Sequence, residues 1–199
     1  MTRVARRSRS TKETTVNVEV CLDGTGRTDV ATGLPFFDHM LSQLGRHGAI
    51  DLTVLASGDL DVDAHHTVED VALALGECVR EALGDKSGVR RFASIELPLD
   101  ETLISAAVDL SGRPFLLYAV DHGGGSEATP LGNPPFHPQL SEEFWRAFTT
   151  AAAITLHIRM ISGRNAHHIV EATFKAVARV LRDAFRIDGE SVPSTKGTL

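Results

Sequence analysis

The sequence contains nearly the same polar hexamer twice, HHTVED at residues 65–70 and HHIVEA at residues 167–172, 102 positions apart. In each copy the first histidine and the glutamate are four residues apart. Residues with this spacing lie on one face of a helix, so each pair can chelate a divalent cation. The second histidine of each hexamer is turned by about 100° around the helix and can reach a second ion. Two such helices could therefore share two metal ions between them.

The ligands divide into two sets, each with a histidine–glutamate pair from one helix and the second histidine of the other: His167, Glu171 and His66 in one set, and His65, Glu69 and His168 in the other. The segments before the hexamers, IDLTV and ITLHI, match at an offset of 104, and this offset places His39 on Glu143 as one further ligand for each site. Nitrogen and oxygen donors without thiolate suit Mn²⁺, Fe²⁺ or Zn²⁺. Four protein ligands on an octahedral ion leave two positions open for substrate, which favours Mn²⁺ or Fe²⁺ over tetrahedral zinc.

A single hexamer of this kind also has an ordinary structural explanation, because a glutamate in the first turn of a helix interacts favourably with the helix dipole. Two copies with a third matched position argue against that explanation. Burying this many histidines and carboxylates without a cation would cost several kcal/mol for each unpaired charge.

The elements that must carry these residues follow the same duplication. In the first half we predict strands at 14–20 and 27–33 joined by the turn DGTG, a helix at 36–48, strands at 49–58 and 59–64, and a helix at 65–83. In the second half we predict strands at 92–99, 103–112 and 113–120, a loop at 121–138, a helix at 140–153, a strand at 154–162 and a helix at 167–185. A duplication with so long a period indicates two similar lobes rather than an array of repeats.

The composition excludes several classes of protein. The net charge of −6 argues against nucleic-acid binding, and no apolar run approaches the roughly 20 residues of a membrane span. The basic N-terminal segment precedes no apolar stretch, so it is interpreted as a loosely held arm rather than a signal peptide. Cys21 and Cys78 have no metal or redox spacing, so we expect a reduced, cytoplasmic protein.

Further cations have a composition suited to phosphate. Arg91 and Arg113 lie at the edges of predicted strands, Lys175 lies on the last helix, and the tail PSTKG at 193–197 combines two hydroxyls with a lysine. Taken singly, each is more often a solvated surface group than a ligand.

The segments PFFDHML, HHTVED, ALGDKSGVRRF, DLSGRPF, TLHIR, GRNAHHIVEATFKA and VPSTKG, in this order, resemble the imidazoleglycerol-phosphate dehydratases of histidine biosynthesis. The likeness runs from about Lys12 to the end and includes no additional phosphatase domain. It implies an α+β fold of the ribosomal protein S5 domain 2-like type, with two similar lobes that are each a four-stranded sheet backed by two helices. We therefore divide the chain into a flexible arm at 1–12, a first lobe at 13–91, a second lobe at 92–187 and a substrate-contacting tail at 188–199.

The resemblance also implies the site. It gives two Mn²⁺ ions per active site, one held by His39, His66, His167 and Glu171 and the other by His65, Glu69, His168 and Glu143, where many members of the family have histidine. The implied substrate contacts are Glu13, Arg91, Arg113, Lys175, Ser194, Thr195 and Lys196. The implied assembly has 24 subunits, with the sites between subunits.

The implied substrate is D-erythro-imidazole-glycerol phosphate, and the products are imidazole-acetol phosphate and water. Our hypothesis is that two metals on the ring nitrogens hold the ring as imidazolate, which expels the neighbouring hydroxyl and makes the next proton acidic. Glu13 and Glu171 are the candidates for proton transfer. Two alternatives remain: a dinuclear metal hydrolase acting on a phosphorylated small molecule, and a metal-binding or storage oligomer without enzymatic activity.

Overall fold

The computed structural model describes residues 2–122 and 129–199, and the same order of elements occurs twice along the chain. The first lobe contains β1 (Val4–Ser10), β2 (Thr14–Cys21), β3 (Thr28–Ala31), α1 (Pro35–Gly48), β4 (Asp51–Gly58) and α2 (His65–Leu83). The second lobe contains β5 (Phe92–Leu99), β6 (Thr102–Asp109), β7 (Phe115–Ala119), α3 (Leu140–Ala152), β8 (Thr155–Ser162) and α4 (Ala166–Ala184).

Each lobe forms one four-stranded sheet. The strand orders are β1-β2-β4-β3 and β5-β6-β8-β7, and in each sheet the last pair is parallel while the other two pairs are antiparallel. Alternate residues of β2 are buried, because successive side chains of a strand point to opposite faces. The predicted α+β fold of two similar lobes, each with one such sheet and two helices, is confirmed.

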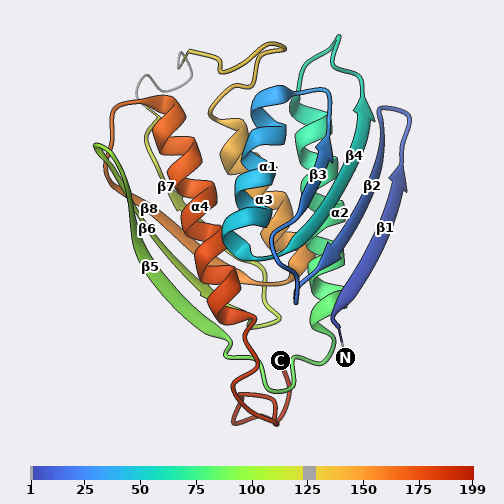
Figure 1. Ribbon diagram of the computed structural model, residues 1–199, viewed down its shortest axis with the longest axis vertical. Coiled ribbons are helices and arrows are strands. Elements are labelled where there is room, and N and C mark those ends of the chain that lie inside the picture. Colours follow the sequence, from blue (N-terminus) through green and yellow to red (C-terminus); the bar gives the residue numbers. More distant parts are fainter. Residues whose placement is uncertain (1, 123–128) are drawn as a thin grey trace.

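The helices lie between the two sheets (Figure 1). Helix α1 packs against α4 of the other lobe, and α2 packs against α3, so the lobes share one hydrophobic core. The contact between α2 and α3 is close at Gly76, where an added Cβ would lie 2.6 Å from the carbonyl oxygen of Phe148. This pairing across the lobes brings residues that are far apart in sequence to the same end of the molecule.

The prediction of a flexible arm at residues 1–12 is wrong, because β1 pairs with β2 along its whole length and Ala5 is buried. The arginines that suggested a loose segment are paired with carboxylates of the same lobe. Arg9 Nε lies 2.7 Å from Asp70 Oδ1, and Arg3 Nη2 lies 2.6 Å from Asp23 Oδ1. The positive charge of this segment is thus balanced locally, and its backbone completes the first sheet.

Two further details of the first lobe differ from the predictions. The segment expected to form a hairpin with β2 is β3, which pairs in parallel with β4 instead. Residues 59–64, predicted as a short strand, form turns that lead into α2. Of the predicted loop at 121–138, residues 123–128 lie outside the described residues, and Phe136 packs in the core against Phe36 and Phe37.

Helices α1, α2, α3 and α4 all begin at one end of the molecule, the upper end in Figure 1, and the C-terminal tail lies at the opposite end. Both hexamers occupy helix starts, so their histidines lie at the upper end. Among the described residues, no helix combines the length and apolar character that crossing a bilayer requires.

Candidate metal centre and anion pocket

Three of the predicted ligands meet where α1 and α4 begin. The ligand atoms of His39, His167 and Glu171 lie within 4.8 Å of one another. Glu171 Oε2 is 2.9 Å from Nε2 of His167 and 3.3 Å from Nε2 of His39. The side chain of Asn165 caps α4 by accepting hydrogen bonds from the backbone N–H groups of His167 and His168, so the helix begins at Ala166, one residue before the hexamer.

Glu171 is held as an anion. Burial alone raises its pKa, but a lysine and two histidines around it outweigh that effect and lower the pKa to about 2. The lysine is Lys175, whose Nζ lies 2.5 Å from Glu171 Oε1. This ion pair leaves Oε2 facing the two imidazoles.

The donor set fits a divalent cation such as Mn²⁺. It consists of two imidazole nitrogens and one carboxylate oxygen, which are ligand types of borderline and hard divalent ions. His39 is exposed and His167 is partly exposed, so an ion would keep positions open toward solvent or substrate.

The second predicted set is not gathered in the same way. His65 Nε2 lies 3.9 Å from Glu69 Oε2, and the Glu143 carboxylate pairs with Arg146, with Oε1 3.5 Å from Nε. Within residues 2–122 and 129–199, the cluster of His39, His167 and Glu171 is the one group of three or more potential ligands close enough to hold an ion.

The second histidines of the two hexamers are each held by a carboxylate. His66 Nδ1 lies 3.0 Å from Asp59 Oδ2, and His168 Nδ1 lies 2.9 Å from Glu101 Oε2. These contacts raise the pKa of both imidazoles, and the contact with His168 lowers the pKa of Glu101. Asp59 and Glu101 could not be identified from the sequence, because their distances along the chain from His66 and His168 differ and form no recognisable pattern.

Glu13, like Asp59, lies near the imidazole of His66. Its Oε2 is 3.9 Å from His66 Nδ1, and its side chain is half exposed. Glu13 precedes β2 in the turn that links β1 to β2, so the hairpin presents its carboxylate at the start of α2.

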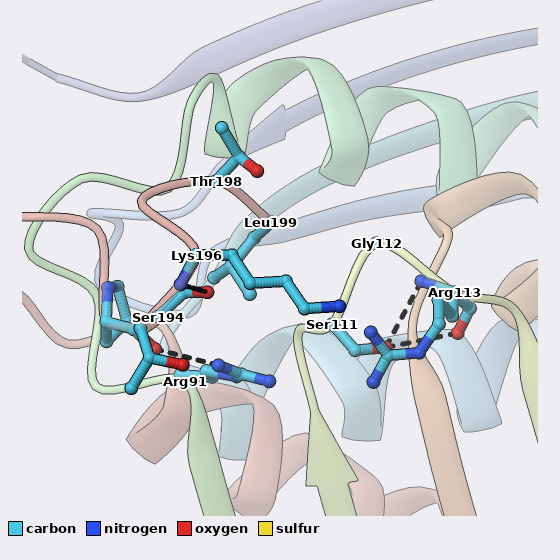
Figure 2. Close-up of a pocket in the computed structure, with 10 residues that line it drawn as sticks. Arg91, Ser111, Gly112, Arg113, Ser194, Lys196, Thr198 and Leu199 are labelled. Atoms are coloured by element: carbon cyan, nitrogen blue, oxygen red, sulfur yellow. Dashed lines mark hydrogen bonds between the residues drawn. The ribbon is translucent and has the colours of Figure 1, made fainter.

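A second site occupies the opposite end of the molecule (Figure 2). It is an open pocket of about 810 Å³ lined by five of the predicted substrate contacts and their neighbours: Arg91, Ser111, Gly112, Arg113, Pro193, Ser194, Thr195, Lys196, Thr198 and Leu199. In Figure 2 the ends of Lys196 and Arg113 point toward one another across this pocket. Convergent lysine and arginine donors suit an anion such as phosphate.

Arg91 is the most firmly held cation of the pocket. Its guanidinium donates from Nε to Asp109 Oδ1 at 2.7 Å and from Nη1 to the Pro193 carbonyl at 2.7 Å. Its backbone φ is +75°, a left-handed conformation that costs free energy in a residue with a side chain. With a further bond to Asp109 from Nη2, two of its five N–H groups remain for a ligand.

A buried lysine behind this pocket was missed in the sequence. Lys86 is almost fully buried, and its Nζ donates a hydrogen bond of 3.0 Å to the Leu110 carbonyl. Burial lowers the pKa of its ammonium group. A Cβ built on Gly112 would lie 3.7 Å from this nitrogen, which places it directly behind the pocket wall. The segment GDKSG contains the lysine, but nothing in its spacing distinguishes it from a surface residue.

Within one chain the two sites are separate. Lys175 lies beside Glu171 and does not line the anion pocket, although it belongs to the predicted set of substrate contacts. Helix α4 starts at the ligand cluster and runs toward the pocket, and its 19 residues span about 28 Å at 1.5 Å per residue. A small ligand cannot contact both ends of a single chain.

The fold and the two sites define a class of protein. It is a duplicated α+β protein with a histidine–carboxylate cluster at one end and a positively charged pocket suited to an anion at the other. Residues 32–181 match the family model of imidazoleglycerol-phosphate dehydratase. The chain belongs to the imidazoleglycerol-phosphate dehydratase family.

Relatives and solved structures agree over nearly the whole chain. The imidazoleglycerol-phosphate dehydratase of Acidothermus cellulolyticus is 56% identical over 99% of this chain and 93% of its own length. That of Parafrankia sp. is 52% identical over the full length of both. The crystal structure from Staphylococcus aureus is 33% identical, with a TM-score of 0.80 over 92% of this chain and 99% of that chain. The structure from Pyrococcus furiosus, in complex with (S)-C348, is 34% identical, with a TM-score of 0.81 over 97% and 100%.

Proposed function

We propose that this chain removes water from D-erythro-imidazole-glycerol phosphate, yielding imidazole-acetol phosphate in histidine biosynthesis, with two Mn²⁺ ions at each active site. Membership of a dehydratase family over the full chain makes it a carbon–oxygen lyase. The observation that carries the metal part of the proposal is the cluster of His39, His167 and Glu171 at the start of α4. When bound, divalent ions supply positive charge that stabilises an anionic azole ring.

Among the chain's own groups, Glu13 is better suited than Glu171 to move a proton. Glu171 is tied to Lys175, and its pKa of about 2 keeps it ionised at neutral pH. Glu13 is half exposed, and the nearest partner of its carboxylate is His66 at 3.9 Å. A general base needs a free carboxylate within reach of substrate, so we assign proton transfer to Glu13.

The pocket at the opposite end binds the phosphate of the substrate. Arg91 is fixed by Asp109 and by the Pro193 carbonyl, so its remaining N–H groups have a defined direction. Arg113 and Lys196 add exposed positive charge, and Ser194 and Thr195 add hydroxyl groups. A rigid arginine orients the phosphate, and the reacting carbons are thereby placed relative to the azole ring.

We further propose that the active site forms between subunits of a 24-subunit assembly. The ligand cluster and the phosphate pocket lie about the length of α4 apart in one chain, so a substrate bridging them needs ligands and pocket from different copies. The unpaired thiols of Cys21 and Cys78 agree with a reducing, cytoplasmic location.

The reaction is tested on protein reconstituted with Mn²⁺ and given imidazoleglycerol phosphate. A dehydratase forms the ketone and releases no inorganic phosphate. A dinuclear hydrolase would release phosphate through a metal-bound hydroxide at the same ligands. Phosphate release without ketone would overturn the proposed reaction, and absence of both products would favour a metal-storage role.

The shared site is tested by complementation. Glu171→Ala damages the ligand cluster and Lys196→Ala damages the phosphate pocket, so we expect each homogeneous assembly to be strongly impaired. If one site takes its two halves from different chains, co-expression of both variants restores part of the wild-type activity, because some sites then contain two intact halves. Mixed assemblies that stay as inactive as their parents would contradict the shared site, and sedimentation of the wild-type protein measures the number of subunits.

A further inference from the structure

The second histidine of each hexamer has a carboxylate on the same ring nitrogen. In the first lobe, Asp59 Oδ2 is 3.0 Å from Nδ1 of His66. In the second lobe, Glu101 Oε2 is 2.9 Å from Nδ1 of His168. Both histidines occupy the second position of their hexamers, in the first turn of α2 and of α4, so the two contacts are equivalent in chemistry and in place.

The two carboxylates nevertheless come from different positions in their lobes. Asp59 directly follows β4, and the residue that matches it after β8 is Gly163. A Cβ at Gly163 would lie 2.9 Å from Ile169 Cγ1 and 3.0 Å from Thr102 Oγ1, so no side chain fits there without a shift of the surroundings. Glu101, in the turn between β5 and β6, supplies the carboxylate instead. The two lobes thus make the same contact from positions that do not correspond to each other. A role confined to local folding would not require both lobes to make this contact.

The contact determines which ring nitrogen is free. An ionised carboxylate only accepts hydrogen bonds, so Nδ1 of each imidazole must carry the hydrogen and donate it. The lone pair is then on Nε2, and within the described part of the chain the nearest carboxylate oxygen to this atom of His168 is Asp100 Oδ2 at 3.9 Å. In His167 the same atom, Nε2, faces another ligand of the cluster, because it lies 2.9 Å from Glu171 Oε2 and a cation bound there would replace the hydrogen between them.

We propose that Asp59 and Glu101 are positioning residues for the metal site, which hold His66 and His168 in the tautomer that presents Nε2 to a divalent cation. This inference rests on the proposed function, in which both histidines are ligands. A carboxylate behind a ligating imidazole fixes its orientation and raises its basicity, and loss of such a partner typically weakens metal binding by about 10–100-fold.

The surroundings of the two carboxylates support a role beyond local folding for Asp59 in particular. Glu101 also accepts hydrogen bonds from the backbone N–H groups of Arg164 and Asn165, so it fixes the entry into α4 as well. In residues 2–122 and 129–199, His66 is the one hydrogen-bond partner of the Asp59 side chain. Its Oδ1 is buried and has no hydrogen-bond partner among the described residues, which costs free energy of folding. The contact of Oδ2 with His66 is the interaction that can offset this cost.

The test measures Mn²⁺ binding without reference to activity. Full-length protein is stripped of metal with a chelator and titrated with Mn²⁺, and the free ion is quantified by electron paramagnetic resonance. We expect Asp59→Ala and Glu101→Gln each to weaken binding at one of the two sites by about 10–100-fold. Asp61→Asn is the matched control, because it removes one exposed acid from the same loop as Asp59 and should bind Mn²⁺ like the wild type.

Circular dichroism and thermal melting of the metal-free variants separate a ligand effect from a folding defect. If Glu101→Gln does not fold, Asp59→Ala decides, since its carboxylate holds no backbone group. Wild-type affinity in Asp59→Ala would overturn the positioning role while leaving the proposed function intact. A wild-type protein that binds no Mn²⁺ would overturn the proposed function and, with it, this inference.

Discussion

Lys175 Nζ lies 2.5 Å from Oε1 of Glu171, one helical turn away, while Oε2 of the same carboxylate faces the imidazoles of His167 and His39. The two oxygens of Glu171 therefore have different partners. The lysine neutralises the negative charge at Oε1 and leaves Oε2 directed toward the ligand cluster. Glu171 thereby also links α4 to His39 on α1 of the other lobe, in addition to the packing of the two helices.

Glu171→Ala should remove both metal and turnover, because the cluster loses its one carboxylate and the two imidazoles lose their common partner. Metal analysis of the purified variant should show loss of Mn²⁺ at this site, and ketone formation should fall to background. The matched control is Glu77→Ala, which removes an exposed helical glutamate paired with Arg7. Full Mn²⁺ occupancy in Glu171→Ala would contradict the ligand assignment.

Glu13→Gln should keep the metal and lose turnover, since it preserves the size of the side chain and removes its basicity. Removal of a general acid or base typically lowers kcat by about 10²–10⁴-fold. Mn²⁺ affinity and kcat are measured on the same preparation. If this variant turns over at the wild-type rate, another group moves the proton.

Gly76→Ala should destabilise the contact between α2 and α3. The added Cβ would meet the Phe148 carbonyl at 2.6 Å and the backbone nitrogen of Ala152 at 2.9 Å, and backbone atoms cannot move aside as a flexible side chain does. Overpacking of this kind costs about 1–3 kcal/mol in free energy of unfolding, which thermal or denaturant unfolding measures. Gly189→Ala serves as the control because nothing lies within 4 Å of its added Cβ, and equal stability of the two variants would mean that the helices separate at no cost.

Asp51 should make part of the stability depend on pH. It accepts hydrogen bonds from the Arg27 side chain and from the backbone N–H groups of Arg27, Thr25 and Gly26, and these lower its pKa well below the ordinary value. A carboxyl group with a lowered folded-state pKa contributes stability above its unfolded pKa of about 3.9, and the contribution is lost as pH falls toward the folded pKa.

The free energy of unfolding of the wild type should therefore decrease as the pH falls below about 5, and Asp51→Asn should be less stable at neutral pH and show a shallower decrease. Denaturant unfolding at a series of pH values measures both slopes. Asp61→Asn, which removes an exposed carboxylate, should retain the wild-type slope. A slope for Asp51→Asn equal to that of the wild type would remove Asp51 as the source.

The hexamers show which contacts can be predicted from local sequence. Residues i and i+4 share a helix face whatever the rest of the fold does, so the pairing of His167 with Glu171 could be predicted from spacing alone. Hydrophobic periodicity likewise located α2, α4, β4 and β8 within two residues, and the offset between the halves predicted two lobes.

Only the tertiary structure shows the features of the sites that depend on contacts between segments distant in sequence. Only the packing of α1 against α4 brings His39 to Glu171, and only the turns after β4 and before β6 bring Asp59 and Glu101 to their histidines. The partners of the β1 arginines also became known only from the tertiary structure, which shows that this segment is a strand and not a loose arm. Likewise, Arg91 and Lys196 line one pocket only because of the path that the C-terminal tail takes. Spacing along a helix is fixed by local backbone geometry, whereas these contacts depend on which faces the whole chain buries together.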